Sequence, residues 1–301
     1  MNKNELKASV KEWKRKRGAI ILAHNYQRGE VQDVADFIGD SLGLSQKAAQ
    51  VKEDVIVFCG VRFMAETAAI LAPEKTILIP DPLAGCPLAA MASAEELKAW
   101  KKRHPGVKVV CYVNTTAEVK AECDICCTSS NAIWVVNSLA TNEVLFVPDK
   151  NLAAYVAGHT EKKIIGWDGY CYVHNNILAK DMREKKRLYP QAEIWVHPEC
   201  RPEVIEMADK VLSTGQMVAE TRKTDKKEII IGTELGIIYR LKKENPSKNF
   251  YPVLNSAYCY DMKKITLVKV LKSLEEMKFK IEVPLDISLK ARGAIEKMIS
   301  L

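Results

Sequence analysis

The chain has 301 residues, 48% of them hydrophobic, which is enough to bury a sizeable core in one large domain or in two to three small ones. Its formal net charge of +7 is spread along the sequence. We interpret the basic clusters at residues 11–17, 183–187 and 223–227 as solvated helix faces or turns. This pattern argues against a nucleic-acid partner and fits small anionic substrates.

Membrane and secreted classes are not indicated either. No apolar run reaches the roughly 18 residues of a membrane span, and residues 1–17 lack the apolar core of a signal peptide. We therefore expect a cytoplasmic protein with no membrane partner. Nine cysteines at irregular spacing do not suggest a disulfide framework, so metal ligation or redox chemistry is favoured for some of them.

Three short apolar runs end in polar side chains. Each run contains β-branched residues and precedes a helix-like segment, which predicts a buried parallel strand with functional residues at its carboxyl end. The runs are residues 19–23 before His24-Asn25-Tyr26, residues 107–111 before Tyr112-Val113-Asn114, and residues 192–196 before His197-Pro198-Glu199.

A second polar cluster follows each strand at a constant interval. The separation of His24 from Ser41 equals that of Tyr112 from Ser129 and that of His197 from Thr214. An aspartate stands at one fixed distance before each of these second positions: Asp36, Asp124 and Asp209. The equal spacing predicts an internal repeat.

Each repeat continues with two more strand-like runs and then a cysteine. The second runs are residues 55–58, 144–147 and 229–231, and the third are residues 76–79, 163–167 and 250–254. The cysteines are Cys86, Cys171 and Cys259, which follow the first polar cluster of their repeats at nearly the same distance. The offset between successive repeats, from His24 to Tyr112 and from Tyr112 to His197, is also nearly constant.

This alternation of strands and helices predicts an α/β fold of three similar, small, parallel, three-layer units. We expect them to surround a pseudo-threefold axis, with a central active site beyond the carboxyl ends of the strands. The first unit spans residues 1–106 with an N-terminal helix, and the tail at 277–301 packs back on it. The second spans 107–190 and the third 191–276.

Two interpretations compete for the metal-binding cysteines. Cys123, Cys126 and Cys127 form a C-x-x-C-C run that resembles half of a zinc or ferredoxin motif, but no second half is present. Cys86, Cys171 and Cys259 instead occur once per repeat. Three converging thiolates suit a 4Fe-4S cluster with one open iron, which acts as a Lewis acid. The alternative is that these three are simply small buried residues.

The same residues carry a family resemblance. The matching segments, in chain order, are Ala23-His24-Asn25-Tyr26-Gln27, Ala35-Asp36, Gly39-Asp40-Ser41, Pro80-Asp81, Ala84-Gly85-Cys86-Pro87, Tyr112-Val113-Asn114, Cys127-Thr128-Ser129, Asn131-Ala132, Gly169, Cys171, Val173-His174, His197-Pro198-Glu199-Cys200, Ser213-Thr214-Gly215-Gln216-Met217, Gly232-Thr233-Glu234 and Cys259 with Met262-Lys263. In these motifs the chain resembles the quinolinate synthase family over nearly its whole length. It departs from members with a C-x-x-C-x-x-C run around the third cysteine, since Cys259 stands alone here.

The resemblance implies a reaction and its participants. Family members condense iminoaspartate with dihydroxyacetone phosphate and release phosphate and two waters, giving quinolinate for de novo NAD biosynthesis. It implies a 4Fe-4S cluster on Cys86, Cys171 and Cys259, and functional coupling to an aspartate-oxidising enzyme that supplies the imine.

The resemblance also implies roles for the strand-end residues. Glu199 is expected to be the general base, because it is the only carboxylate beside a strand-end histidine and partial desolvation can tune such a group toward neutral pH. Tyr26, Tyr112, Asn114, His174 and His197 are expected as acid, base or orienting partners. Anionic groups of the substrates are expected to meet the side chains His24, Ser41, Ser129, His197, Ser213 and Thr214, with Tyr112, Asn114 and Glu199 completing the substrate site. Taken singly, Ser41 and Thr214 would be read as helix N-caps.

Two other functions remain open at this point. One is a different hydro-lyase with an open-iron 4Fe-4S cluster that acts on a small hydroxy acid and needs no phosphate site. The other is a zinc-stabilised binding module that uses Cys123, Cys126 and Cys127 and engages nucleic acid through the basic clusters.

Overall fold

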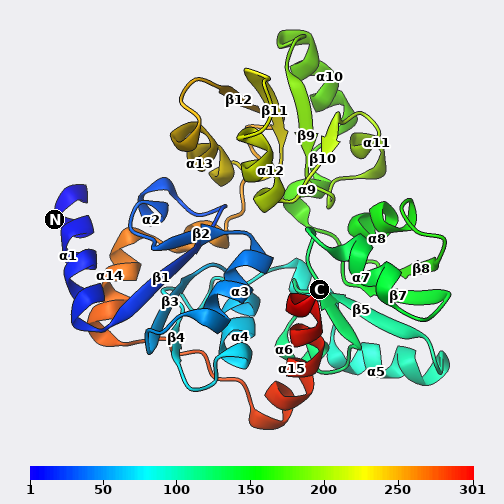
Figure 1. Cartoon of the computed structure of the whole chain (residues 1–301), viewed down its shortest axis with the longest axis horizontal. Coiled ribbons are helices and arrows are strands. Elements are labelled where there is room, and N and C mark those ends of the chain that lie inside the picture. The colour runs from blue at the N-terminus through cyan, green and yellow to red at the C-terminus, as the bar shows by residue number, and fades with distance from the viewer.

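The computed structural model describes residues 1–301 and contains three four-stranded sheets, all parallel. The first has the order β2 (Phe37–Gly39), β1 (Ala19–His24), β3 (Val55–Cys59), β4 (Thr76–Leu78). The second runs β6 (Ile125–Cys127), β5 (Lys108–Tyr112), β7 (Glu143–Val147), β8 (Lys163–Gly166), and the third β10 (Lys210–Val211), β9 (Glu193–Val196), β11 (Glu228–Gly232), β12 (Asn249–Pro252). The strand order is the same each time, and the sheets form three lobes (Figure 1). The predicted α/β fold of three similar units is confirmed, while the unit boundaries and the pseudo-threefold axis stay predictions.

Helices follow the strands in each lobe. Those of the first are α1 (Lys3–Lys16), α2 (Gly29–Gln32), α3 (Ser41–Gln50), α4 (Arg62–Leu71) and α5 (Ala94–Arg103), with a 3-10 turn at Leu88–Met91. The second contains α6 (Ala117–Lys120), α7 (Ala132–Ser138), α8 (Lys150–Ala157), α9 (Tyr172–Asn175) and α10 (Ala179–Leu188). The third contains α11 (Pro202–Ile205), α12 (Thr214–Thr221), α13 (Gly236–Glu244) and a 3-10 turn at Met262–Lys264, before α14 (Leu267–Glu276) and α15 (Leu285–Ser300). No helix has the length and apolar character needed to cross a membrane.

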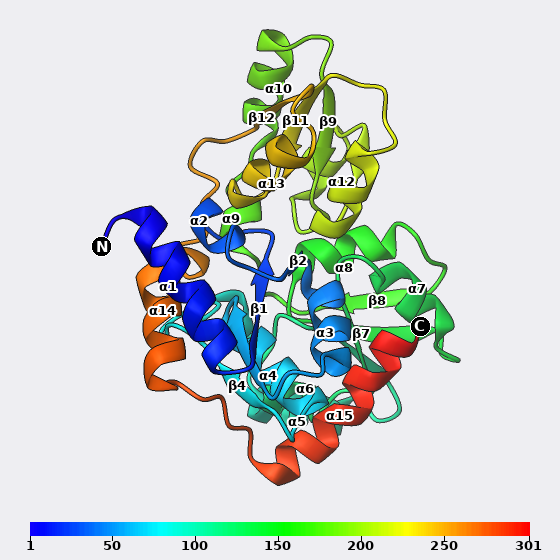
Figure 2. The same ribbon diagram turned by 60° about the vertical axis from the view of Figure 1, so that its left-hand side comes forward.

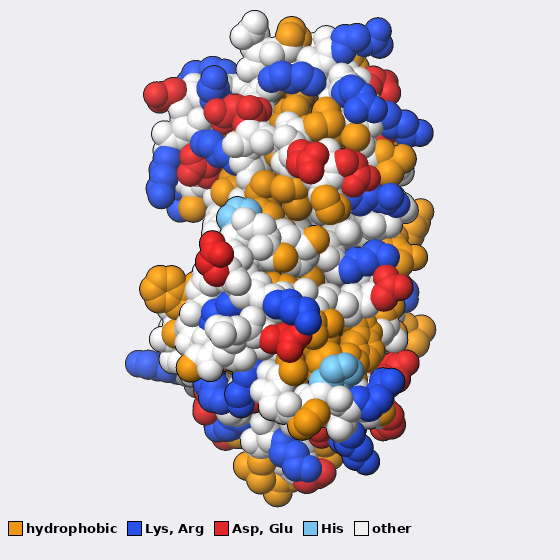
Figure 3. Space-filling model, turned by 90° about the vertical axis from the view of Figure 1, so that its right-hand side faces the viewer, with side chains coloured by type: hydrophobic (Ala, Val, Ile, Leu, Met, Phe, Trp, Pro, Cys, Tyr) orange, Lys and Arg blue, Asp and Glu red, His pale blue; other side chains and the backbone are white.

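The two ends of the chain frame the first sheet. Helix α1 packs on α14, and both contact this sheet from one side, while α3 and α4 pack together on the other side (Figure 2). Helix α15 contacts α3 and α4 of the first lobe and also α6 and β6 of the second. The C-terminal helix therefore joins two lobes. On the face seen in Figure 3, Lys and Arg side chains are interspersed with Asp and Glu.

The central strands are buried because the sheets are covered on both faces. Every residue of β1 and β3 is buried, which explains why they read as continuous apolar runs rather than as alternating ones. In the third sheet, successive side chains point to opposite faces. Ile194 and Val196 join a small separate core of 11 residues, whereas Trp195 joins the main core of 69 residues.

The repeat extends to individual hydrogen bonds. The carboxylates of Asp36, Asp124 and Asp209 accept the backbone N–H of Ile21, Val109 and Ile194, at 2.8, 2.9 and 2.8 Å. Each aspartate also donates its own N–H to the carbonyl oxygen of the same strand residue. The three equally spaced aspartates therefore have one structural role, which is to hold the return loop against the first strand.

We expect Asp124→Ala to lower the free energy of unfolding by about 1–3 kcal/mol at neutral pH, because the N–H of Val109 loses its charged acceptor. Urea unfolding checks this. The control is Asp168→Ala, which removes an aspartate whose side chain is 92% exposed. The control should change the stability by less than about 0.5 kcal/mol.

The Asp124 effect should depend on pH. Burial favours the protonated carboxyl, but hydrogen bonds from Lys108 and the Val109 N–H outweigh it and hold the pKa below its ordinary value. Because the folded-state pKa is the lower one, the stabilisation is complete above the unfolded-state pKa of about 3.9 and is lost as the pH falls through the folded-state pKa. A destabilisation that stays constant from neutral pH down to acid unfolding would contradict this account.

Candidate active site and metal centre

A single pocket gathers side chains from all three lobes at the carboxyl ends of their strands. Of the residues predicted from the sequence, it is lined by His24, Tyr26, Ser41, Cys86, Tyr112, Asn114, Ser129, Cys171, His174, His197, Glu199, Thr214 and Cys259. Ser213 is the one predicted site residue that does not line it. Cys123, Cys126 and Cys127 lie outside the pocket.

Similar turns follow β1 and β9. The backbone N–H of Tyr26 donates to Nδ1 of His24 at 3.1 Å, and that of Glu199 reaches Nδ1 of His197 at 3.3 Å. For His24 this bond leaves Nε2 to carry the proton of the neutral ring. Burial lowers the pKa of His24 to about 3, so the ring is neutral at physiological pH.

Buried donors fix the backbone of each strand-end turn. Nζ of Lys263 donates to the carbonyl oxygen of Tyr26, and Nζ of Lys120 donates to that of Val113 at 2.8 Å. Nδ2 of Asn151 donates to the carbonyl of Glu199 at 3.1 Å. The side chains that follow the strands are therefore presented from a restrained backbone, as a preorganised site requires.

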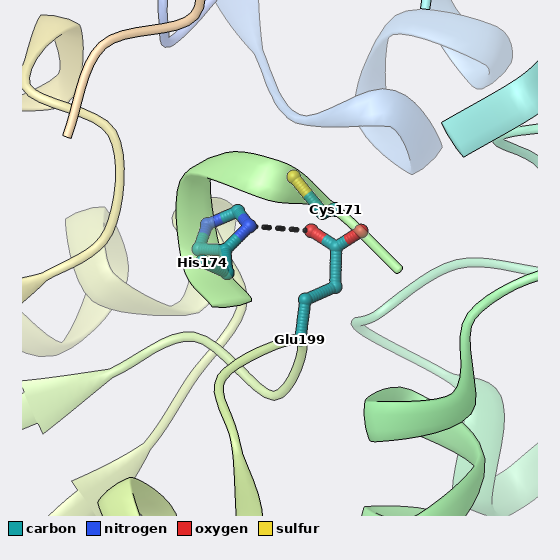
Figure 4. A group of neighbouring side chains, drawn as sticks. All are labelled: Cys171, His174 and Glu199. Atoms are coloured by element: carbon teal, nitrogen blue, oxygen red, sulfur yellow. Dashed lines mark ion pairs between the residues drawn. The ribbon is translucent and has the colours of Figure 1, made fainter. Parts of the chain in front are cut away.

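Glu199 lies between two histidines. Its Oε2 is 3.0 Å from Nδ1 of His174 and 3.2 Å from Nδ1 of His197, and the imidazole rings stack with centroids 4.5 Å apart (Figure 4 shows the first contact). Burial opposes ionisation of Glu199, but the two histidines outweigh it and hold its pKa well below the ordinary value. The expected tuning toward neutral pH is thus wrong in direction, because the histidines act as the stronger influence.

Thr233 connects two pocket residues, and sequence reasoning gave it no role although it lies in the matching segment Gly232-Thr233-Glu234. Its Oγ1 lies 2.6 Å from the hydroxyl of Tyr26 and 2.8 Å from Nε2 of His174. Thr233 directly follows β11, so its place at the carboxyl end of a central strand was the available signal. On the other side of the histidine pair, Nε2 of His197 is 3.2 Å from Oγ of Ser129.

The two tyrosines are neutral hydrogen-bonding groups. Burial, reinforced by the charge of Glu199, raises the pKa values of Tyr26 and Tyr112 well above 10. Two buried oxygens in the site have no hydrogen-bond partner: Oδ1 of Asn114 and Oε1 of Glu199. Since buried polar atoms are normally paired, these two indicate places where a bound ligand makes contact.

Helix starts account for the remaining polar residues. The N-caps of α3 and α12 are Asp40 and Ser213, so Ser41 and Thr214 are the first helical residues rather than caps. Oγ of Ser130 donates to Asp40 at 2.7 Å and lies 2.8 Å from Oγ of Ser213. These three side chains therefore link the three lobes beside the pocket.

Two of the three predicted cysteine ligands have a buried carboxylate behind them. The N–H of Cys171 donates to Oδ2 of Asp149 at 3.0 Å, and that of Cys259 donates to Oε1 of Glu234 at 3.1 Å. Sequence reasoning did not name Asp149 and gave Glu234 no role, although the two acids occupy equivalent positions of the second and third repeats, where the first repeat has Val61. Glu234 also pairs with Lys263 at 2.9 Å.

The thiols fit a metal centre. Burial raises the pKa of Cys86 to about 12, and the charge of Cys259 adds to this. Cys171 is affected in the same way by burial and by the charges of Glu199, Cys86 and Cys259, which raise its pKa. Three thiolates that line one buried pocket are stable only beside a positive charge, which a metal group provides.

A second donor set overlaps the first. The ligand atoms of Cys171, His174 and Glu199 all lie within 4.8 Å of one another (Figure 4). The pocket thus contains a candidate Cys/His/Glu metal-binding group, with Cys171 common to both sets.

Comparisons with known proteins identify the family. Residues 8–300 match the family described as Quinolinate synthetase A protein. The chain is 60% identical over 290 residues to a quinolinate synthase of Dehalococcoides mccartyi, covering 96% of each chain. It is 55% identical over 289 residues to one of Thermodesulfovibrio yellowstonii, covering 96% of this chain and 95% of the relative. It is 53% identical over 292 residues to quinolinate synthase 2 of Methanosarcina acetivorans, covering 97% and 94%. With a family match over almost all of its length, and with relatives matched nearly end to end, the chain belongs to the quinolinate synthase family.

Proposed function

We propose that the protein condenses iminoaspartate with dihydroxyacetone phosphate to form quinolinate, phosphate and water, with a 4Fe-4S cluster held by Cys86, Cys171 and Cys259. The observation that carries the proposal is the pocket itself, which brings together one cysteine and one strand-end turn from each lobe. Membership of the family supplies the reaction. An aspartate-oxidising enzyme is the corresponding source of the imine.

We favour the three-cysteine set over the set of Cys171, His174 and Glu199, because His174 and Glu199 already contact other side chains of the protein. Nε2 of His174 is within hydrogen-bonding distance of Oγ1 of Thr233. Oε2 of Glu199 contacts Nδ1 of both His174 and His197. The thiols of Cys86 and Cys259 have no comparable side-chain role in the pocket. When bound, a cluster held by three cysteines supplies an open iron as a Lewis acid.

The anionic groups of the substrates would be bound by uncharged hydrogen-bond donors and by helix N-termini. Ser41 and Thr214 open helices α3 and α12, where unpaired backbone N–H groups face outward from the helix end. Together with Ser129 and the neutral His24, they form the predicted contacts for phosphate and carboxylate groups. Oδ1 of Asn114, which has no partner in the protein, can accept a hydrogen bond from the substrate.

Proton transfer centres on Glu199. Because its pKa is held low, it is ionised and can accept a proton from substrate at the unpartnered Oε1. His174 and His197 keep the carboxylate charged and oriented through Oε2. Tyr26 and Tyr112, whose pKa values are raised, retain their phenolic protons and can donate hydrogen bonds to substrate oxygens.

We expect about four iron and about four sulfide ions per chain in protein purified without oxygen, with quinolinate and phosphate formed in equal amounts from the two substrates. Cys86→Ala and Cys259→Ala should each lose the cluster and the activity, whereas His174→Ala should keep the iron. Cys59→Ala is the control, since Cys59 is buried in β3 away from the pocket. Metal without sulfide, lost in His174→Ala but kept in Cys86→Ala, would instead establish the Cys/His/Glu site.

Glu199→Gln should leave iron and sulfide unchanged and reduce turnover by about 10²–10⁴-fold, because it removes the proton acceptor while keeping the side-chain shape. Steady-state quinolinate formation and iron analysis on the same samples test this. The matched control is Glu203→Gln, which changes an exposed glutamate of α11 and should leave turnover at the level of the parent protein. Near-parental turnover of Glu199→Gln would remove Glu199 from the role of base.

A further inference from the structure

A chain of side-chain hydrogen bonds runs from helix α13 to the pocket through Asn25. Asn25 directly follows β1 and is fully buried. Its Oδ1 accepts from Nη1 of Arg240 at 2.7 Å, and its Nδ2 donates to Oγ1 of Thr214 at 2.9 Å. Asn25 belongs to the first lobe, whereas Arg240 and Thr214 belong to α13 and α12 of the third. Of these three residues, only Thr214 lines the pocket.

The backbone of Asn25 is also hydrogen-bonded on both sides. Its N–H donates to the carbonyl of Gly39 at 3.0 Å, and its carbonyl accepts from Nε2 of Gln32 at 3.2 Å. Both contacts lie within the first lobe. The side-chain amide is therefore presented from a restrained position.

Arg240 is fixed by two further contacts. Its Nη1 also donates to the carbonyl of Ile38 at 2.8 Å, and its Nε pairs with Glu244, one turn further along α13, at 2.6 Å. The charge of the guanidinium is thus balanced by Glu244. Towards Asn25 the guanidinium acts as a hydrogen-bond donor of fixed direction.

Arg240 determines the orientation of the Asn25 amide. A guanidinium has only donors, so the amide oxygen faces Arg240 and the amide nitrogen faces Thr214. The amide nitrogen is also only a donor, so the Thr214 hydroxyl accepts this bond and keeps its own proton for another partner. Thr214 is 2% exposed, and its hydroxyl has no second hydrogen bond within the protein. Because buried donors are normally paired, the expected partner is an acceptor on a ligand in the pocket.

We propose that Asn25 and Arg240 are positioning residues that make Thr214 a hydrogen-bond donor to an anionic oxygen of the substrate. They act by occupying the acceptor side of the hydroxyl, so that its proton is available to the pocket. The inference rests on the proposed function and deepens it. Ionised carboxylate and phosphate oxygens, both present on the proposed substrates, accept such a bond.

The test measures the dissociation constants of quinolinate and of inorganic phosphate for the iron-loaded protein by calorimetry without oxygen. Quinolinate carries carboxylates and no phosphate, so the two titrations tell which anionic group Thr214 binds. Thr214→Val should weaken one of the two ligands about 10–100-fold, because it removes one hydrogen bond to a charged group. Asn25→Asp should weaken the same ligand to a similar extent, since its carboxylate accepts from Arg240 and also takes the proton of Thr214.

The double variant Asn25→Asp/Thr214→Val separates positioning from a general effect of the new charge. If Asn25 acts through the hydroxyl, the double variant binds that ligand as Thr214→Val does, within about twofold. A further loss of similar size in the double variant overturns the proposal, because the effect then does not depend on Thr214.

Arg240→Met tests the other end of the chain of contacts. It leaves the Asn25 amide free to turn over and should weaken the same ligand, whereas Arg240→Lys keeps a side chain that can only donate and should retain most of the affinity. Arg222→Met is the matched control, since Arg222 also pairs with Glu244, at 2.8 Å, but its side chain is 62% exposed. This control should bind both ligands like the parent protein, and iron content and melting temperature are measured on every variant.

Two results count against the proposal in different ways. Binding of neither ligand by the parent protein contradicts the proposed function, and the inference fails with it. Binding by the parent protein that neither Thr214→Val nor Asn25→Asp weakens overturns only the inference about Asn25 and Arg240.

Discussion

Parallel pairing of the strands is the constraint on which the rest of this structure depends. In a sheet ordered β2-β1-β3-β4, the chain leaves β1 on one side and returns to the other, so the ends of β1 and β3 form a crevice between diverging connections. The same order occurs three times, and each crevice supplies its own side chains. The turn after β1 provides His24 and Tyr26, and its counterparts provide Tyr112 with Asn114 and His197 with Glu199. The three lobes thus differ in the residues that they place at equivalent points of one repeated frame.

Buried charge is the cost of this arrangement, and the structure offsets it locally. Lys263 pairs with Glu234 and also binds the carbonyl of Tyr26, so one ion pair restrains both a strand-end turn and the loop that carries Cys259. Asp149 has a similar place behind Cys171. Removing one partner of such a pair leaves an uncompensated charge in the interior, which is far more destabilising than the pair itself is stabilising. The carboxylates behind the cysteines are consequently part of the structural support of the site.

Sequence reasoning reached the fold and most of the pocket because both follow from spacing. One constant interval marks His24 with Ser41 and its two counterparts, and the structure places all six of these residues in one pocket. Spacing says little about which atoms touch. The spacing gave Thr233 no role, and the pKa of Glu199 depends on two histidines, one of which, His174, comes from the preceding repeat.

The separation of the three pocket cysteines along the chain has a thermodynamic consequence. Cys86, Cys171 and Cys259 belong to different repeats, so about one whole repeat separates each from the next. A group that binds all three thiols closes two long loops across lobes that otherwise meet through side-chain contacts such as those of Ser130 with Asp40 and Ser213. The entropic cost of closing a loop grows only with the logarithm of its length. Closing these long loops therefore costs little more than closing short ones. Binding also favours the folded chain by mass action. A bound group therefore adds a tie between the three lobes that stabilises the folded chain.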